Sequence, residues 1–283
     1  MPSTTTTTTT TTTKPTSTST APPVSIQKEN HDTILHTLST KCHSTATLAQ
    51  NQYRIGTPTA PPPNPQRTKK HTALAIDCEM VGIDPRNTGY LGQVVAIDVL
   101  SGKTVLDICV QPPVAVRNWR GKSSGLSPAV FKEYNRRGKL VSEIKGAQKA
   151  LFKLMDSETI LVGHALQNDL QALGIVHGCV VDTQILTKEL AGGFAGVLPN
   201  RTWGLKGLAR DILGRDIQRG KGHDCVEDTL ATRDLVLACI RDEGVGEWAE
   251  GEASCAGNFP STSWGEEQDE MWDLDSNNVN SWL

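Results

Sequence analysis

The middle of the chain, residues 71–243, shows an order of patterns that limits what it can fold into. Three strand patterns come in succession, and shorter apolar runs then alternate with helical patterns. The strand patterns cover residues 73–82, 93–100, 104–110, 160–163 and 180–182. Strands in succession, followed by strands that alternate with helices, are typical of a mixed sheet with helices on its faces. We therefore expect one α/β domain in this region.

Helical patterns lie between and after these strands. One of them begins at Ser127-Pro128, where a serine suited to the N-cap precedes a proline suited to the first turn. The helical patterns cover residues 127–137, 141–155, 168–173, 204–213 and 224–241. We expect these helices to cover the two faces of the sheet.

The N-terminal quarter differs from this domain in composition. Residues 1–24 are a threonine tract with Ser and Pro, which is too polar to bury a core. Residues 57–66 are rich in proline and predict an extended linker. We therefore expect residues 1–70 to be a disordered Thr/Pro-rich region and linker, with a short helix near residues 33–38.

Residues 244–283 form an acidic C-terminal tail. They hold nine Asp or Glu and no Lys or Arg, so the net charge of −3 arises here rather than in the domain. This composition predicts disorder. An alternative is that aromatic side chains among the acids dock into the groove of a protein partner. The tail contains Trp248, Trp264, Trp272 and Trp282.

Cysteine usage and hydropathy indicate the compartment. The seven cysteines are scattered without a CxxC pair, so neither a disulfide framework nor a zinc ribbon is predicted. No stretch approaches the roughly 20 apolar residues of a membrane span. We expect a soluble, intracellular protein without membrane contact, and Arg67-Thr-Lys-Lys70 is a weak nuclear-localisation signal. A metal cluster could be suspected near the N-terminus, but its spacing fits no standard zinc pattern. Its residues would be His31, His36, Cys42 and His43.

The first strand carries two carboxylates. Because side chains alternate along a strand, Asp77 and Glu79 lie on one face. The other face is apolar and carries Leu74, Ile76, Cys78 and Met80. Taken alone, this pattern fits a strand with one solvated face equally well.

The last helical pattern places a carboxylate among apolar residues. Asp228 shares its face with Leu235 and Cys239. The opposite, polar face carries Glu227, Asp234 and Arg241. A carboxylate within an apolar stripe must be paired, protonated or bound to a cation. No Lys or Arg shares that stripe, so we predict a hard divalent cation such as Mg²⁺ or Mn²⁺.

Two further residues, His223 and Asp169, are candidate site residues because of their positions in the sequence. His223 precedes Asp228 by five residues in a glycine-containing loop, which suits a general base. Asp169 lies where a buried strand gives way to a helix. An acid in the first turn of a helix commonly complements the helix dipole, so a structural role fits Asp169 equally well.

The order of these residues resembles the three exonuclease motifs of the DEDDh group of 3′-to-5′ exonucleases. Asp77-x-Glu79 comes first, Asn168-Asp-Leu follows, and His223-x4-Asp228 comes last. Further stretches are similar to the branch that contains RNA exonuclease 4 and the interferon-stimulated exonuclease. These are DCEMVG, LVGHALQNDLQAL, VVDT, GLKGLARDILGRDIQ and HDCVEDTLATRDLV. The similarity covers about residues 73–241.

The resemblance implies a ribonuclease H-like fold with a five-stranded sheet flanked by helices. It also implies that two divalent ions, Mg²⁺ or Mn²⁺, are held by Asp77, Glu79, Asp169 and Asp228. In the same way it implies that His223 deprotonates the attacking water, so that nucleoside 5′-monophosphates are released from a 3′ end.

Two further residues match substrate contacts of the family. Met80 matches the residue beside the terminal nucleotide, and Arg120 matches a loop arginine that contacts the substrate. Relatives carry Ala-Arg where this chain has Gly92-Gln93, so the role of that arginine is not carried over.

Basic residues around these positions favour a groove for single-stranded nucleic acid. They are Arg117, Arg120, Lys122, Lys132, Arg136, Arg137, Lys139, Arg215, Arg219 and Lys221. RNA is favoured over DNA through the resemblance alone, with ribosomal RNA processing in the nucleus or nucleolus as one setting. A DNA exonuclease of repair type and a non-catalytic nucleic-acid-binding scaffold remain alternatives.

Overall fold

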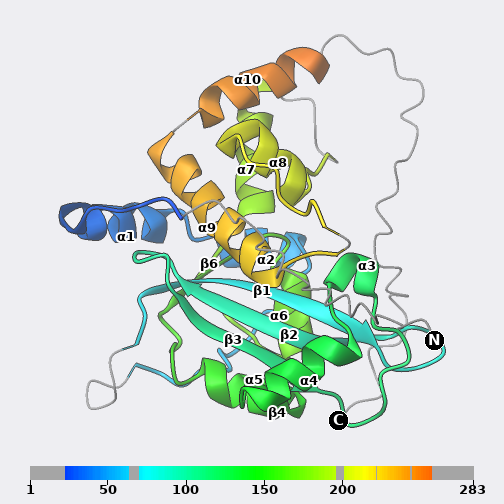
Figure 1. Cartoon of the computed structure of the whole chain (residues 1–283). Helices are drawn as coiled ribbons and strands as arrows, with labels where there is room; N and C mark the ends of the chain where they lie inside the picture. Colours follow the sequence, from blue (N-terminus) through cyan, green and yellow to red (C-terminus); the bar gives the residue numbers. More distant parts are fainter. Residues whose placement is uncertain (1–22, 64–69, 196–200, 221, 243, 257–283) are drawn as a thin grey trace, which may run out of the picture.

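A six-stranded sheet, in the order β4-β3-β2-β1-β5-β6, forms the centre of the protein (Figure 1). The computed structural model describes residues 23–63, 70–195, 201–220, 222–242 and 244–256. The strands are β1 (Ala73–Gly82), β2 (Gly89–Asp98), β3 (Thr104–Gln111), β4 (Leu140–Ser142), β5 (Ile160–Gly163) and β6 (Val180–Asp182). β2 runs antiparallel to β1 and β3, whereas the other neighbours are parallel. The predicted mixed sheet is therefore confirmed.

The sheet has one strand more than the five expected. Leu140–Ser142 forms the edge strand β4, and α5 begins only at Glu143, inside the stretch 141–155 that was expected to be one helix. Glu143 has φ +55°, so the chain turns sharply from strand to helix at this residue. Hydrophobicity alone does not separate so short an edge strand from the first turn of an apolar helix.

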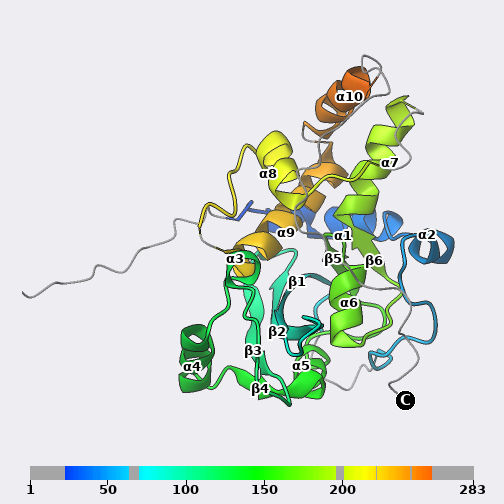
Figure 2. The same ribbon diagram turned by 90° about the vertical axis from the view of Figure 1, so that its right-hand side faces the viewer.

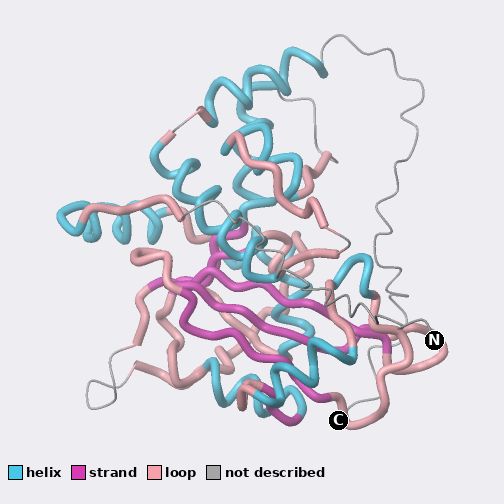
Figure 3. The backbone as a smooth tube through the Cα atoms, viewed as in Figure 1, coloured by secondary structure: helices cyan, strands magenta, loops and turns pink. Residues whose placement is uncertain are grey.

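Helices cover both faces of the sheet, as predicted. They are α1 (His31–Thr40), α2 (Thr45–Gln50), α3 (Gly121–Ser124), α4 (Pro128–Arg136), α5 (Glu143–Leu151), α6 (Gln167–Leu173), α7 (Thr183–Ala195), α8 (Leu205–Leu213), α9 (Cys225–Arg241) and α10 (Val245–Ala256), with a 3-10 turn η1 (Lys28–Asn30). One hydrophobic layer is formed with α1, α7, α8, α9 and α10, and the other with α2, α5 and α6. Figures 1 and 2 show α8, α9 and α10 on one side of the sheet and α5 on the other, and Figure 3 shows the strands between them.

The central strand β1 is longer than its parallel neighbour. β5 pairs with β1 only at residues 73–75, whereas β2 follows β1 as far as Gly82. Among the described residues, positions 77–80 of β1 therefore have a strand neighbour on the β2 side alone. Side chains from the helical layers on both faces can meet at this edge.

The segment 23–63 packs on the domain, so the expected disorder of residues 1–70 does not hold for it. α1 buries Ile34 and Leu38 in the layer of α9, and α2 buries Leu48 in the opposite layer. α1 confirms the short helix expected near residues 33–38, whereas the apolar pattern of α2 is too short to stand out among the surrounding Thr and Pro. The threonine tract falls in residues 1–22, which lie outside the described residues.

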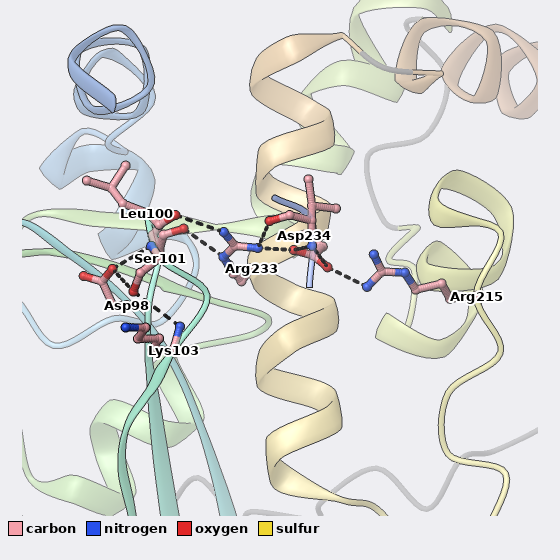
Figure 4. Close-up of polar contacts among 9 residues, drawn as sticks. Asp98, Leu100, Ser101, Lys103, Arg215, Arg233 and Asp234 are labelled. Carbon is pink, nitrogen blue, oxygen red and sulfur yellow. Dashed lines mark hydrogen bonds and ion pairs between the residues drawn. The ribbon is translucent and has the colours of Figure 1, made fainter. Parts of the chain in front are cut away.

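A buried ion cluster joins α9 to the N-terminal segment and to the turn between β2 and β3 (Figure 4). Arg233 and Asp234 are 0% and 1% exposed, and Arg215 reaches Asp234 at 2.5 Å. The backbone N–H of Val24 donates to Asp234, and Arg233 donates to the carbonyls of Val24 and Val99. The predicted position of Asp234 on a polar face is wrong, because the middle of α9 is buried on nearly all sides.

α10 extends the fold beyond the expected domain end at residue 243. Val245, Trp248 and Ala249 are buried in the layer of α7 and α8. The rings of Trp248 and Trp203 meet edge to face with 5.2 Å between centroids. Trp248 is therefore a core residue rather than a docking residue. The other three tryptophans of the tail fall in residues 257–283, outside the described residues.

Among the helices of the described residues, none combines the length and apolar character that a bilayer crossing requires.

Candidate active site

β1 brings two carboxylates to the face covered by α9. Ala75, two residues before Asp77, belongs to the hydrophobic layer of α9, whereas Ile76 and Cys78 belong to the opposite layer. The residues of β1 therefore alternate between the two hydrophobic layers, as the sequence predicts, and Asp77 and Glu79 are on the α9 side. The thiol of Cys225, at the start of α9, donates to the carbonyl of Asp77 at 3.4 Å. α9 thus begins directly over Asp77.

α9 supplies Asp228 to the same region. The side chain of Asp224 caps the helix by accepting hydrogen bonds from two backbone N–H groups of its first turn. Asp228 follows one turn later and is buried. The side-chain amide of Gln218 donates to Oδ2 of Asp228 at 2.9 Å, and Nδ1 of His223 lies 3.4 Å from that oxygen. Within the described part of the chain, Oδ1 of Asp228 is buried without a hydrogen-bond partner.

Asp169 reaches the cluster from the opposite layer. It is the third residue of α6, which buries Leu170 and Leu173 in the layer of α5. Burial raises the pKa of the Asp169 carboxyl, and the charge of Asp77 raises it further. The charges of Asp77 and Asp169 therefore interact, although Asp77 lies on the face of β1 that α9 covers and Asp169 lies on α6, in the opposite layer.

The four carboxylates share one electrostatic environment. Burial is the largest cause that raises the pKa of each, and for Glu79 the charges of the other three raise it further. Among the described residues, the one base within ion-pair distance of any of them is His223. Buried like charges without arginine or lysine partners must take up protons or bind a cation.

The donor set fits a hard divalent cation. Ligand atoms of Glu79, His223 and Asp228 lie within 4.8 Å of one another, as do those of Asp77, Glu79 and Cys225. Carboxylate oxygens are the ligands that Mg²⁺ and Mn²⁺ prefer. The buried, unpartnered Oδ1 of Asp228 is an oxygen that such a cation would satisfy.

The loop that carries His223 packs backbone to backbone against α3. The N–H of His223 donates to the carbonyl of Ser123 at 3.1 Å. Gly125 has φ +64°, and a Cβ there would lie 2.3 Å from the His223 carbonyl oxygen. A Cβ on Gly222 would lie 2.5 Å from the carbonyl oxygen of Gly121. The two glycines therefore permit the close approach that places His223 beside Asp228.

Arg120 immediately precedes α3, and Met80 directly follows Glu79. The Arg120 guanidinium donates to the carbonyl and the side-chain oxygen of Asn87. Met80 is partly buried against the layer of α5 and α6, at a register irregularity of β1. The structure thus places Arg120 next to the loop of His223, and it places Met80 against the layer of α5 and α6 directly after Glu79.

Gln93 has hydrogen-bond partners in β3 and in α4. It lies opposite Glu79 on β2 and is buried. Its side-chain amide donates to Asp107 at 3.1 Å and to the hydroxyl of Tyr134 at 2.9 Å. This amide therefore links β2 to β3 and α4.

Several residues of the predicted basic groove are paired with acids. Arg136 and Arg137 both bind Glu133, at 2.7 and 2.6 Å. Lys139 binds Asp107 at 2.9 Å. The expectation that Arg215 tracks phosphate is wrong, because its guanidinium is held by the buried Asp234. Exposed members of the set include Arg117, Lys122 and Lys132, and Lys221 lies outside the described residues.

Three residues near the cluster were not singled out from the sequence. Gln218 and Cys225 contact Asp228 and Asp77, and Asp182 binds the backbone that leads into α6. All three lie in stretches noted for their similarity to relatives. No spacing rule marks such supporting residues, because each of them binds a partner in another element of the fold.

Comparisons with known proteins identify the family. The family model RNase_T, described as Exonuclease, matches residues 74–236. RNA exonuclease 3 of Candida albicans is 36% identical over 177 residues, which cover 61% of this chain and 39% of that protein. RNA exonuclease 4 of Candida glabrata is 36% identical over 171 residues, which cover 60% of each chain. The chain therefore spans less than two thirds of the length of these relatives.

A solved structure supports the fold. The Saccharomyces cerevisiae Pan2 pseudoubiquitin hydrolase-RNA exonuclease module in complex with AAGGAA RNA aligns with a TM-score of 0.55 and 21% identity. The alignment covers 73% of this chain and 34% of that chain. The expected ribonuclease H-like fold is confirmed. Because the family model matches more than half of its residues, the chain belongs to the RNase_T exonuclease family.

Proposed function

We propose that the protein is a 3′-to-5′ exoribonuclease that releases nucleoside 5′-monophosphates. The observation that carries this proposal is that Asp77, Glu79 and Asp228 gather their ligand atoms in two overlapping groups beside His223. The buried Asp169 lies close enough for its charge to raise the pKa of Glu79. RNA is favoured because the relatives are named RNA exonucleases and because the Pan2 module was solved with RNA.

The four carboxylates are the proposed ligands of two divalent ions, Mg²⁺ or Mn²⁺. When bound, such ions would stabilise the charges that develop on the attacking and leaving oxygens. Gln218 orients Asp228 for this task by holding Oδ2. Oδ1 of Asp228 and the neighbouring carboxylate of Glu79 remain as hard donors in the same buried space.

His223 is the proposed general base. With Nδ1 facing Oδ2 of Asp228 at 3.4 Å, a proton on Nδ1 is directed towards this carboxylate. In that tautomer Nε2 is the nitrogen that accepts a proton from the attacking water. The side chain of His223 is 41% exposed, so the imidazole can exchange that proton with solvent after each cycle.

The substrate is proposed to enter between Met80 and the loop of Arg120. Met80 would lie beside the terminal nucleotide. Arg120 would exchange its hydrogen bonds with Asn87 for contacts with the substrate phosphate. Arg117 and Lys122 flank Arg120 and are exposed, which supports a path for a single-stranded backbone.

Digestion of labelled RNA tests this function. Wild-type protein with Mg²⁺ or Mn²⁺ should shorten RNA stepwise from a free 3′ end and release 5′-monophosphates, whereas a blocked 3′ end or a chelator should stop it. Asp77→Asn should abolish turnover. Asp211→Asn is the matched control, because Asp211 forms an exposed pair with its neighbour Arg210. Activity that survives Asp77→Asn or chelation would contradict the mechanism.

The two alternatives are separated by the same assay. A DNA exonuclease would degrade a matched DNA oligonucleotide at least as fast as the RNA. A non-catalytic scaffold would bind the oligonucleotides and leave them intact. The buried cluster disfavours a scaffold, because a binding protein gains nothing from crowded carboxylates beside its nucleic acid.

The cellular setting forms a separate part of the proposal. We place the protein in the nucleus or nucleolus, in RNA processing such as ribosomal RNA maturation. Arg67→Ala with Lys69→Ala should then redistribute a fluorescent fusion into the cytoplasm. Lys70 is left unchanged because its ammonium group binds the carbonyls of Phe152 and Lys153 at the end of α5.

A protein partner is proposed for residues 257–283, which carry Trp264, Trp272 and Trp282 among acids. Substitution of these three tryptophans should remove the partner and leave hydrolysis of a bare oligonucleotide unchanged. Slower hydrolysis would instead assign the tail to the enzyme.

A further inference from the structure

Asp182, at the end of β6, is a buried carboxylate with a complete set of donors. It is 0% exposed. Oδ1 accepts hydrogen bonds from the backbone N–H groups of Ala165 and Gln184, at 3.1 and 2.8 Å. Oδ2 accepts from the N–H of Leu166 at 2.8 Å and from the hydroxyl of Tyr53 at 2.5 Å. Four donors of this kind compensate a buried negative charge.

The backbone that Asp182 holds is the turn that leads into α6. Leu166 is the N-cap residue of α6, and its side chain cannot cap the helix. The carboxylate of Asp182, at the end of β6, instead accepts the hydrogen bond of the Leu166 N–H. Ala165 has φ +53°, which is costly for a residue with a Cβ. Asp169 follows three residues after Leu166. The position of the Asp169 carboxylate therefore depends on this turn.

Two partners of Asp182 come from the N-terminal segment, outside the family match at residues 74–236. The hydroxyl of Tyr53 binds the carboxylate, and the backbone N–H of Asp182 donates to Nε2 of His43 at 2.9 Å. The N–H of His43 donates in turn to Val180 at 2.9 Å, so the segment attaches to the edge strand β6. Both side chains are buried. Figure 2 shows α2, which lies between them in sequence, beside β6 and α6.

The Tyr53 hydroxyl acts as a hydrogen-bond donor to Asp182. Burial raises the pKa of Tyr53, and the charges of Asp182 and Asp169 raise it further. The phenol therefore keeps its proton at neutral pH and directs it to Oδ2 of Asp182. Its ring packs in the same layer as Leu48, Leu166 and Leu170. Tyr53 thus binds the carboxylate that holds the turn and lies in the same hydrophobic layer as the buried residues of α6.

We propose that Tyr53 is a positioning residue of the nuclease site, which acts through Asp182 on the turn before α6 and so sets the place of Asp169. The proposal rests on the proposed role of Asp169 in metal binding. The N-terminal segment then contributes to catalysis as well as to stability. Without the Tyr53 hydroxyl, Asp182 loses one of its four hydrogen-bond donors, and the turn before α6 is held less firmly.

A pair of single-hydroxyl variants in the full-length protein tests this. Tyr53→Phe removes the hydroxyl and keeps the ring. Thr59→Val is the matched control, because Thr59 also fastens the N-terminal segment, through a 2.9 Å hydrogen bond from Val176 to its hydroxyl, but does not touch Asp182. Thermal unfolding of both variants measures the purely structural effect of each hydrogen bond, as the shift of Tm from the wild-type value.

Mn²⁺ binding, followed by electron paramagnetic resonance, and RNA hydrolysis are then compared. We expect Tyr53→Phe to weaken Mn²⁺ binding and lower kcat by about tenfold, the lower end for residues that support metal ligands, with little change in KM for RNA. Thr59→Val should leave Mn²⁺ binding, kcat and KM unchanged. Raising the Mn²⁺ concentration should restore part of the lost turnover of Tyr53→Phe.

Equal behaviour of the two variants in Mn²⁺ binding and kcat would overturn the proposal, because Tyr53 would then serve stability alone. A protein that binds Mn²⁺ but does not cleave RNA would overturn the proposed function. In that case the Mn²⁺ comparison would still decide the role of Tyr53.

Discussion

Gln218 donates its side-chain N–H to Oδ2 of Asp228 at 2.9 Å, the same oxygen that lies 3.4 Å from Nδ1 of His223. The backbone N–H of Gln218 is held by Glu227 at 2.8 Å, so α9 fixes the donor as well as the acceptor. Burial raises the pKa of Asp228, and the hydrogen bond from Gln218 acts in the opposite direction. Gln218 therefore favours the ionised, oriented form of Asp228 that a cation requires.

Gln218→Leu keeps the approximate size of the side chain and removes this donor. We expect Mn²⁺ affinity or kcat to fall by about 10- to 100-fold, as is usual for residues that hold a metal ligand. Gln111→Leu, at the exposed end of β3, is the control and should leave both unchanged. Calorimetric titration with Mn²⁺ and single-turnover hydrolysis measure the two quantities. Normal affinity and turnover in Gln218→Leu would show that Asp228 keeps its orientation without the amide.

Gly125→Ala tests the packing of α3 against the His223 loop. The new Cβ would lie 2.3 Å from the carbonyl oxygen of His223, so the backbone must move apart. Gly138→Ala is the matched control, because Gly138 has nearly the same φ, +66°, and open space around its Cβ position. Both variants carry a left-handed strain of about 1–2 kcal/mol.

Hydrolysis separates the two effects of these alanines. We expect a loss of kcat of at least about tenfold in Gly125→Ala, which is 1.4 kcal/mol of barrier. Gly138→Ala should lose stability in thermal unfolding and keep its kcat. Similar kcat values in the two variants would show that the approach of α3 does not position His223.

The carboxylate cluster predicts how the metal-free protein responds to pH. Folding raises the pKa of Asp77, Glu79, Asp169 and Asp228, with burial as the first cause. A carboxyl whose pKa is raised by folding contributes stability that is complete below its unfolded pKa, near 4, and is lost as the pH rises through the folded value. The metal-free protein should therefore unfold at lower temperature as the pH rises above about 4–5.

Thermal unfolding with a chelator, at about pH 5 and about pH 8, measures this trend. Each kcal/mol lost lowers Tm by about 2–4 °C in a domain of this size. Asp228→Asn removes one titrating group and should flatten the trend. Mg²⁺ should raise Tm more at the higher pH, because the ion binds ionised carboxylates. A Tm that rises with pH at the same rate in both proteins would contradict the shared burial of these acids.

The sequence was sufficient for the layers of the fold and for the residues that local geometry constrains. Strand alternation places Asp77 and Glu79 opposite Ile76 and Cys78, and the core follows the same division. The apolar stripe of α9 around Asp228 likewise predicts a buried carboxylate, which is observed. Both inferences use a period within a single element, and such a period is visible in one sequence.

The supporting contacts could not be predicted, because each joins residues far apart in the chain. Tyr53 meets Asp182 across 129 positions, and Arg233 meets Val24 across 209. Helical periodicity predicts a polar face for Asp234, because a period within one helix cannot show that Arg215 reaches it from another segment. In the same way, composition predicts disorder for the segments that contain Leu48 and Trp248, and it does not reveal that these two side chains are buried.

Truncation at two points of the C-terminus separates the core from the tail. Removal of residues 244–283 deletes Trp248, whose ring packs on Trp203, and exposes the layer formed with α7 and α8. Loss of a buried aromatic side chain alone costs about 3–5 kcal/mol. We therefore expect this truncation to lower Tm strongly and to reduce the yield of active protein.

Removal of residues 257–283 leaves α10 intact and is the matched control. We expect its Tm and its turnover on a bare oligonucleotide to equal those of the full chain. Trp248→Ala in the full chain should reproduce most of the loss seen on removal of residues 244–283, because the effect comes from the core contact. If Trp248→Ala keeps the Tm of the full chain, α10 contributes little to the fold and residue 243 is the true end of the domain.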